Sequence, residues 1–172
     1  DELVSLTGAP YDTMQSVIGH VRDVPGSLKE FGVSYREMPM PAGGIDLEHL
    51  SDYVNAKTKM VLIQRSRGYS LRATLTVAEI AAACAAVKAI APECICFVDN
   101  CYGEFVEEQE PTAVGADLMA GSLIKNPGGG LAPTGGYIAG RRDLVELAAF
   151  RLTAPGIGAE LGASLGGNRL LY

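Results

Sequence analysis

The sequence lacks tryptophan, and aromatic residues make up only 6% of its 172 positions. It also lacks an excess of positive charge, since 14 Lys and Arg stand against 20 Asp and Glu, for a formal net charge of -6. No local basic cluster offsets this balance, so we expect no binding to nucleic acid. Hydrophobic residues reach 48%, a content typical of a chain with a packed core rather than a disordered one.

Long apolar runs and metal-ligand spacings are missing too. The longest apolar stretch, residues 77–91, is interrupted by Glu79 and Lys88 and is shorter than the roughly 20 residues of a membrane-spanning helix. No basic and apolar leader opens the chain, so we expect a cytoplasmic protein without membrane association. Four cysteines without a C-x-x-C pair, beside two histidines, do not favour a metal site. We expect Cys84, Cys94 and Cys96 to be small buried side chains.

Short apolar runs alternate with helical patterns along the chain. Thr76 and Glu79 form a T-x-x-E capping box before an alanine-rich helix that Pro92 ends. We expect strands at residues 3–6, 33–38, 59–64 and 95–98, and further helices that begin at Asp12 and at Asp46. Apolar strands separated by helices predict an α/β domain: a three-layer, mainly parallel sheet with helices on both faces. Ligands of such sheets bind beyond the carboxyl ends of the strands.

Three strand ends carry polar residues. The first is Val98-Asp99-Asn100-Cys101-Tyr102, where Asp99 either caps the following turn or delivers a carboxylate into the crevice. In the second, Lys125 lies between an apolar stretch and three glycines; its amine either reaches solvent or is desolvated, with a lowered pKa suited to a Schiff base. The third is Gln64-Arg65-Ser66-Arg67-Gly68-Tyr69, whose arginines are either solvated or bind a carboxylate or phosphate.

Asp99 at a strand end is followed three residues later by Tyr102, and further on by a Ser-x-x-Lys motif, Ser122 to Lys125, before the glycines. This combination resembles the fold-type I pyridoxal-phosphate enzymes, whose large domain has the aminotransferase-like fold. The resemblance implies pyridoxal 5'-phosphate as cofactor, held as a Schiff base on Lys125, with Asp99 paired to the pyridine nitrogen. It implies that Ser122 binds the phosphate and that Tyr102 hydrogen-bonds the phenolic oxygen of the cofactor. Lys125, once freed by the substrate, is then the natural general base.

The segments around Gln64, Asp99 and Lys125, together with residues 7–13 and 151–158, are similar to the aluminium-resistance family, which is related to cystathionine β-lyase and methionine γ-lyase. The likeness implies a carbon–sulfur lyase that acts on a sulfur-containing amino acid by β- or γ-elimination. Gln64 and Ser66 become cofactor-binding candidates, and Tyr11 a candidate for stacking on the cofactor ring. The chain departs from the better-known lyases at Ile124, where they carry a phosphate-binding hydroxyl, and after Gln64, where they carry an Asn.

The resemblance also bears on the extent of the chain and on its partners. Enzymes of this type have an N-terminal segment with a phosphate-binding loop and a C-terminal small domain with an arginine for the substrate carboxylate. We expect residues 1–172 to be the central part of the cofactor-binding domain, ending within a helix at residues 170–172 and inactive alone. The intact protein is expected to be a homodimer or homotetramer, because such enzymes build each site at a subunit interface.

Two alternatives remain open at this point. The cofactor residues are shared by aminotransferases and aldolases of the same fold, so an enzyme of either kind is compatible with them. A non-catalytic α/β binding module is the other alternative, in which the glycine-rich loop only packs or pairs with a partner. Many of the 21 glycines flank Lys125, where backbone without side chains allows a phosphate-bearing cofactor to approach.

Overall fold

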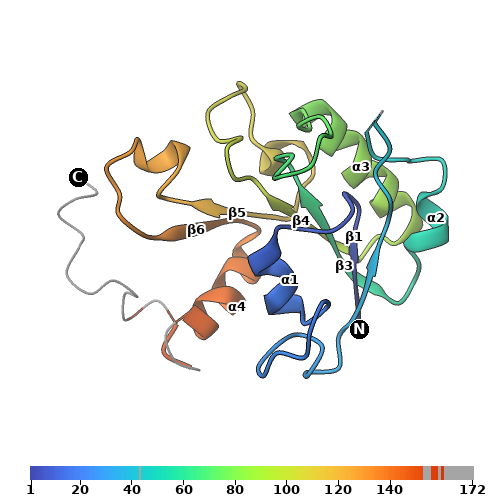
Figure 1. Cartoon of the computed structure of the whole chain (residues 1–172), viewed down its shortest axis with the longest axis horizontal. Coiled ribbons are helices and arrows are strands. Elements are labelled where there is room, and N and C mark those ends of the chain that lie inside the picture. The colour runs from blue at the N-terminus through green and yellow to red at the C-terminus, as the bar shows by residue number, and fades with distance from the viewer. Residues whose placement is uncertain (43, 153–155, 159, 161–172) are drawn as a thin grey trace.

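The computed structural model describes residues 1–42, 44–152, 156–158 and 160. Within these ranges, six strands form one sheet in the order β2-β1-β3-β4-β5-β6, at the centre of the molecule (Figure 1). The first five strands in this order run parallel to one another, and β6 is antiparallel to β5. The strands are β1 (Glu2–Ser5), β2 (Ser34–Glu37), β3 (Thr58–Gln64), β4 (Ile95–Asp99), β5 (Leu118–Ser122) and β6 (Gly136–Gly140).

Helices connect the parallel strands, as the pattern predicts. They are α1 (Asp12–Ile18), α2 (Leu50–Tyr53), α3 (Val77–Ile90) and α4 (Arg142–Leu152), with 3-10 turns η1 (Pro111–Val114) and η2 (Asn126–Gly128). The mainly parallel α/β architecture is therefore confirmed. The expectation of a helix at residues 170–172 lies outside the described residues.

The two faces of the sheet pack against different helices. Cys96 and Val98 of β4 join the larger core cluster, which includes Ile80 and Val87 of α3. Phe97, which lies between them in β4, packs instead against the smaller cluster around Ile18 of α1. This alternation follows from the two-residue repeat of a strand, and it assigns each residue near a strand end to one face of the sheet.

The capping box that opens α3 forms as predicted. The Thr76 hydroxyl accepts a hydrogen bond from the backbone N–H of Glu79 at 3.2 Å, and the Glu79 carboxylate accepts one from the Thr76 N–H at 2.7 Å. Both bonds satisfy N–H groups that a helix leaves free at its start. The helix ends at Ile90, two residues before Pro92.

The second predicted helix is much shorter than expected. The Asp46 carboxylate accepts hydrogen bonds from the backbone N–H of His49 at 3.3 Å and pairs with its ring at 2.8 Å. Asp46 thus caps only a turn, and α2 begins at Leu50, after an N-cap residue, His49, whose side chain makes no capping hydrogen bond to the helix. The prediction of a helix starting at Asp46 is wrong because this local turn competes with the helix for the capping group. Likewise, α1 has Tyr11 as its N-cap and Asp12 as its first residue.

The three cysteines expected in the core lie there. Cys84, Cys94 and Cys96 are buried, and burial raises the pKa of the Cys94 thiol to about 11. Among the described residues, no helix is both long and apolar enough to cross a membrane.

Replacing Thr76 with alanine removes the cap of α3. We expect Thr76→Ala to lower the free energy of unfolding by about 1 kcal/mol, since capping residues contribute that much. Chemical denaturation followed by circular dichroism measures it. Thr74→Ala, two residues earlier at an exposed position, is the matched control and is expected to change little. Equal effects of the two substitutions would contradict the capping role.

Candidate active site

The three polar strand ends converge at one edge of the sheet. Gln64, the last residue of β3, is paired in register with Asp99, the last residue of β4. Asp99 is in turn paired with Ala120 of β5, two residues before Ser122. Because these strands are parallel, their carboxyl ends lie side by side, and residues 64, 99 and 120 point to the same face of the sheet, the α1 face.

Asp99 does cap the turn that follows it. Its carboxylate accepts a hydrogen bond from the backbone N–H of Cys101 at 3.1 Å. The next residue, Tyr102, has a positive φ of 67°, a conformation that costs most side chains about 1–2 kcal/mol. This turn directs the chain so that Tyr102 faces the loop after β5.

Lys125 meets this turn from the other side. Its Nζ lies 4.4 Å from the centre of the Tyr102 ring, in a cation–π contact. Burial lowers the pKa of Lys125, but the neighbouring Cys101 thiol, Tyr102 and the Asp99 carboxylate outweigh burial and leave the pKa above its usual value. The interpretation of a desolvated amine with a lowered pKa is therefore wrong, because an acidic turn surrounds the amine. The spacing of residues around Lys125 in the sequence does not predict that its amine lies close to Cys101.

A cysteine-to-alanine change tests this balance. In Cys101→Ala the amine loses its thiol neighbour while burial remains, so we expect the pKa of Lys125 to fall. The pH titration of methyl-labelled lysine by NMR measures the change. Cys94→Ala, in the core, serves as the control and should leave the pKa of Lys125 where it is. An unchanged value in Cys101→Ala would show that the thiol is not the cause.

Gln64 joins the start of α1 to the end of β3. Its side chain is buried; Oε1 accepts a hydrogen bond from the backbone N–H of Tyr11 at 2.7 Å, and Nε2 donates one to the carbonyl of Ser66 at 3.1 Å. The Tyr11 hydroxyl lies 3.0 Å from that of Tyr69. This contact with Tyr69, together with the charges of Asp12 and Tyr102, raises the pKa of Tyr11 to about 12.

A cavity of about 630 Å³ opens beside Gln64, and Tyr11 forms part of its wall. Three further lining residues, Arg67, Tyr69 and Arg72, lie in the loop between β3 and α3. The sequence analysis gave Tyr69 no role of its own and did not name Arg72, since a loop has no periodicity that would assign a direction to its side chains. Asp99, Ser122 and Lys125 do not line this cavity.

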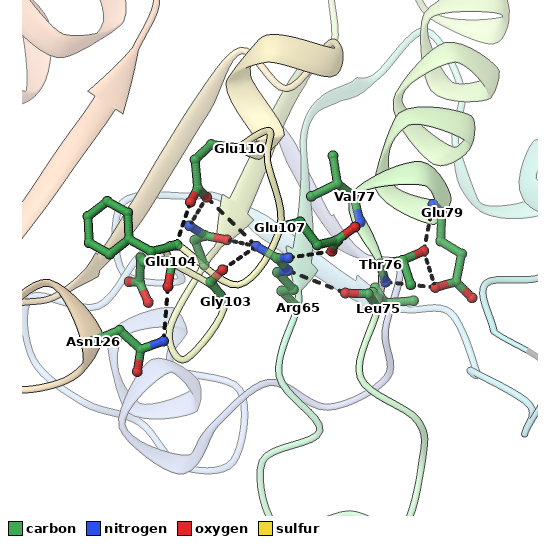
Figure 2. Close-up of polar contacts among 12 residues, drawn as sticks. Arg65, Leu75, Thr76, Val77, Glu79, Gly103, Glu104, Glu107, Glu110 and Asn126 are labelled. Carbon is green, nitrogen blue, oxygen red and sulfur yellow. Dashed lines mark hydrogen bonds and ion pairs between the residues drawn. The ribbon is translucent and has the colours of Figure 1, made fainter.

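Arg65 lies on the opposite face of the sheet and is almost fully buried, with 1% of its surface exposed. Figure 2 shows its guanidinium between the loop after β4 and the start of α3. It donates hydrogen bonds to the Glu107 carboxylate at 2.6 Å, the Asn100 amide oxygen at 2.8 Å and the Gly103 carbonyl at 2.9 Å. Of the two expectations for Arg65, solvation is wrong and binding to a carboxylate is confirmed, with the carboxylate supplied by Glu107 of this chain.

Glycine is required where this network is tightest. A Cβ on Gly103 would overlap the Arg65 guanidinium, and one on Gly121 would overlap the Glu104 carboxylate. Glu104 Oε1 accepts a hydrogen bond from the Tyr137 hydroxyl at 2.8 Å. The amide of Asn126 donates to the Glu104 carbonyl at 3.1 Å (Figure 2). This last bond ties the residue after Lys125 to the loop that carries Tyr102.

The glycines after Lys125 serve the backbone. A Cβ on Gly128 would overlap the carbonyl oxygen of Leu123, and Gly129 and Gly130 have φ values of 56° and 78°. These left-handed conformations suit glycine best. Part of the glycine excess is thus explained by the turn itself.

Removing Arg65 should destabilise the protein strongly. We expect Arg65→Met to lower the free energy of unfolding by about 3 kcal/mol, because one partner of a buried ion pair leaves the Glu107 carboxylate without its charge partner. Denaturant titration is the measurement. Arg67→Met, two residues on at an exposed position, is the control and should cost about 0.5 kcal/mol or less. Comparable losses in both variants would refute the central role of Arg65.

Comparisons with known proteins agree with the resemblance. A family model described as methionine gamma-lyase matches residues 1–172. The protein YnbB of Bacillus subtilis (strain 168), described as uncharacterized, is 52% identical over 168 residues, or 96% of this chain and 40% of that protein. A 33.9 kDa protein of Lactobacillus delbrueckii subsp. bulgaricus is also 52% identical, over 91% of this chain and 52% of its own length. The chain thus spans 40% to 52% of the length of these curated relatives.

Solved structures of related proteins are also similar to this chain. A "putative cystathionine beta-lyase involved in aluminum resistance" from Listeria monocytogenes has a TM-score of 0.94 and 54% identity, over all of this chain and 43% of its own. A "carbon-sulfur lyase involved in aluminum resistance" from Clostridium novyi NT has a TM-score of 0.92 and 46% identity, over all of this chain and 41% of its own. The pyridoxal-5'-phosphate-dependent protein YhfS of Escherichia coli, at 16% identity and a TM-score of 0.63 over 89% of this chain and 36% of its own, shares the fold.

Proposed function

The chain belongs to the methionine gamma-lyase family, and we propose that the protein is a pyridoxal-phosphate-dependent carbon–sulfur lyase that acts on a sulfur-containing amino acid. The observation that carries the proposal is the cluster of Asp99, Tyr102 and Lys125 at the carboxyl edge of the sheet, where the Lys125 amine lies 4.4 Å from the Tyr102 ring centre. Ligands of parallel sheets bind at this edge.

The donor set fits pyridoxal phosphate in its chemistry. Asp99 offers a carboxylate to the protonated ring nitrogen, and Lys125 offers the amine for the aldehyde. The hydroxyl of Ser122 lies at the end of β5, beside the strand that carries Asp99, and is assigned to the phosphate. The Tyr11 side chain, 40% exposed at the start of α1, supplies a ring for stacking.

When bound, pyridoxal phosphate supplies an electron sink for the pair of electrons left when the substrate Cα loses its proton. The negative charge of Asp99 would favour the protonated form of the ring nitrogen, which would sustain that capacity. The Lys125 amine would hold the aldehyde of this group and would be the general base for the proton on the substrate Cα. Tyr102 and Cys101 lie beside this amine at the edge of the sheet, and both raise the pKa of Lys125.

The attachment of the cofactor tests the role of Lys125. Pyridoxal phosphate added to the intact protein should give an absorbance band near the edge of the visible range, which borohydride fixes to Lys125. Lys125→Ala is expected to abolish the band. Lys59→Ala, exposed on β3, is the control and should retain it. A band of normal intensity in Lys125→Ala would end the proposal.

The products identify the reaction. A lyase releases a thiol, ammonia and a 2-oxoacid from a sulfur-containing amino acid and water, with no further reactant. Assays with L-cystathionine and L-methionine, with and without an added 2-oxoacid acceptor, measure this directly. Turnover that requires the acceptor would indicate an aminotransferase instead.

A further inference from the structure

Glu104 has a buried carboxyl group whose hydrogen bonds the described part of the chain only half satisfies. The residue lies in the loop after β4 and is 4% exposed. Its Oε1 accepts a hydrogen bond from the Tyr137 hydroxyl at 2.8 Å, whereas Oε2 is buried and has no partner among the described residues. Arg65, the arginine of this network, pairs with Glu107 and Glu110 instead. A buried carboxyl in this state costs stability, which points to a role in what the residue holds in place.

The side chain of Glu104 packs against the end of β5. A Cβ on Gly121 would overlap both the Glu104 carboxylate and the Tyr137 ring, so these two groups lie directly against the glycine. Gly121 is also paired in register with Tyr137 of β6. Because successive residues of a strand point to opposite faces, Ser122 points to the face that carries Asp99. The bond between Glu104 and Tyr137 thus supports, from behind, the strand end that presents Ser122.

The backbone of Glu104 holds the chain a second time, four residues further on. Its carbonyl accepts a hydrogen bond from the side-chain amide of Asn126 at 3.1 Å (Figure 2). Between these two contacts the chain makes a turn, in which the N–H of Lys125 donates to the carbonyl of Ser122 at 3.2 Å. Glu104 therefore contacts both ends of residues 121–126, the segment that carries Ser122 and Lys125.

We propose that Glu104 is a positioning residue that keeps the Lys125 amine beside the Tyr102 ring. It does so by fixing both ends of residues 121–126 to the loop that carries Tyr102. The inference rests on the proposed function for the use of this amine in cofactor binding, but the placement of the amine depends on contacts within the chain alone. Glu104 acts through these contacts and not through its charge, and the two means can be separated by substitution.

The first measurement is made on the intact protein before cofactor is added. The pKa of Lys125 reports the position of its amine, because burial lowers it while the adjoining Cys101, Tyr102 and Asp99 raise it by more. Glu104→Ala releases the segment, so the amine should move away from these neighbours and its pKa should fall toward the usual value of a lysine. The pH titration of methyl-labelled lysine by NMR measures the shift.

Three further variants separate contact from charge. Glu104→Gln retains an acceptor oxygen for the Tyr137 hydroxyl and removes the charge, so the pKa of Lys125 should stay at its wild-type value. Tyr137→Phe removes the donor and should lower this pKa as well. The double variant should show no larger fall than Glu104→Ala, since the two residues share one hydrogen bond. Glu108→Gln, which removes an exposed charge from the same loop, is the matched control and should behave as the wild type does.

The second measurement is the apparent affinity of the intact protein for pyridoxal phosphate, followed by its absorbance band. Glu104→Ala should weaken this affinity about ten-fold, the effect of losing one buried hydrogen bond. Glu104→Gln should recover most of the loss, and Glu108→Gln should show none.

Three results would overturn the proposal. These are a wild-type pKa of Lys125 in Glu104→Ala or in Tyr137→Phe, equal losses in Glu104→Gln and Glu104→Ala, which would assign the effect to charge, and additive effects in the double variant. Thermal denaturation checks that each variant is folded. If Glu104→Ala does not fold, Tyr137→Phe, which deletes a single hydroxyl, decides the question alone. If Lys125→Ala keeps the cofactor band while the pKa of Lys125 still falls in Tyr137→Phe, the lyase assignment is lost and the positioning role remains.

Discussion

The buried guanidinium of Arg65 is the constraint on which the candidate site depends. It is 1% exposed and binds the loop after β4 at Asn100, Gly103 and Glu107. Glu107 also accepts a hydrogen bond from the N–H of Val77 at 3.0 Å, so one ion pair holds the loop against the start of α3. Because Tyr102 belongs to this loop, its position opposite Lys125 is secured from the far face of the sheet.

At the carboxyl ends of the strands, the two faces of the sheet carry different kinds of residues. Residues of alternating direction leave each strand end, so Arg65 follows Gln64 and Asn100 follows Asp99, on opposite faces. The face against α3 carries a polar network buried in the protein, while the face against α1 carries Asp99, Gln64 and the cavity. A buried charge is costly unless it is paired, which explains why the network collects two carboxylates, Glu107 and Glu110, around one arginine.

The contrast among the arginines of the loop after β3 gives the site its electrostatic character. Arg65 is neutralised within the chain, whereas Arg67 and Arg72 face the cavity without a carboxylate partner among the described residues. Three arginines within eight positions therefore have different surroundings. Burial and the direction of the side chain decide these surroundings, and the residue type does not.

Local patterns were sufficient for much of the fold. The T-x-x-E box predicted the start of α3 because both of its hydrogen bonds form within four residues, and apolar runs predicted the bounds of β1 to β4, but not those of β5 and β6, to within about a residue. The helix at Asp46 was predicted wrongly, since Asp46 closes a turn on His49. Likewise, the lowered pKa expected for Lys125 overlooked its neighbours, because Cys101, Tyr102 and Asp99 outweigh the effect of partial burial.

By itself, the sequence determined the fold class and the candidates Asp99, Ser122 and Lys125. Strands, helix caps and strand-end motifs depend on residues that lie close together in the chain, so short segments are enough to predict them. Only the tertiary structure decided which side chains meet. The register of β3 with β4 places Gln64 beside Asp99, and residues far apart in the chain bury Arg65 and open the cavity at Arg67. Contacts over 35 or more positions, such as that of Arg65 with Asn100, depend on packing, and no short pattern encodes them.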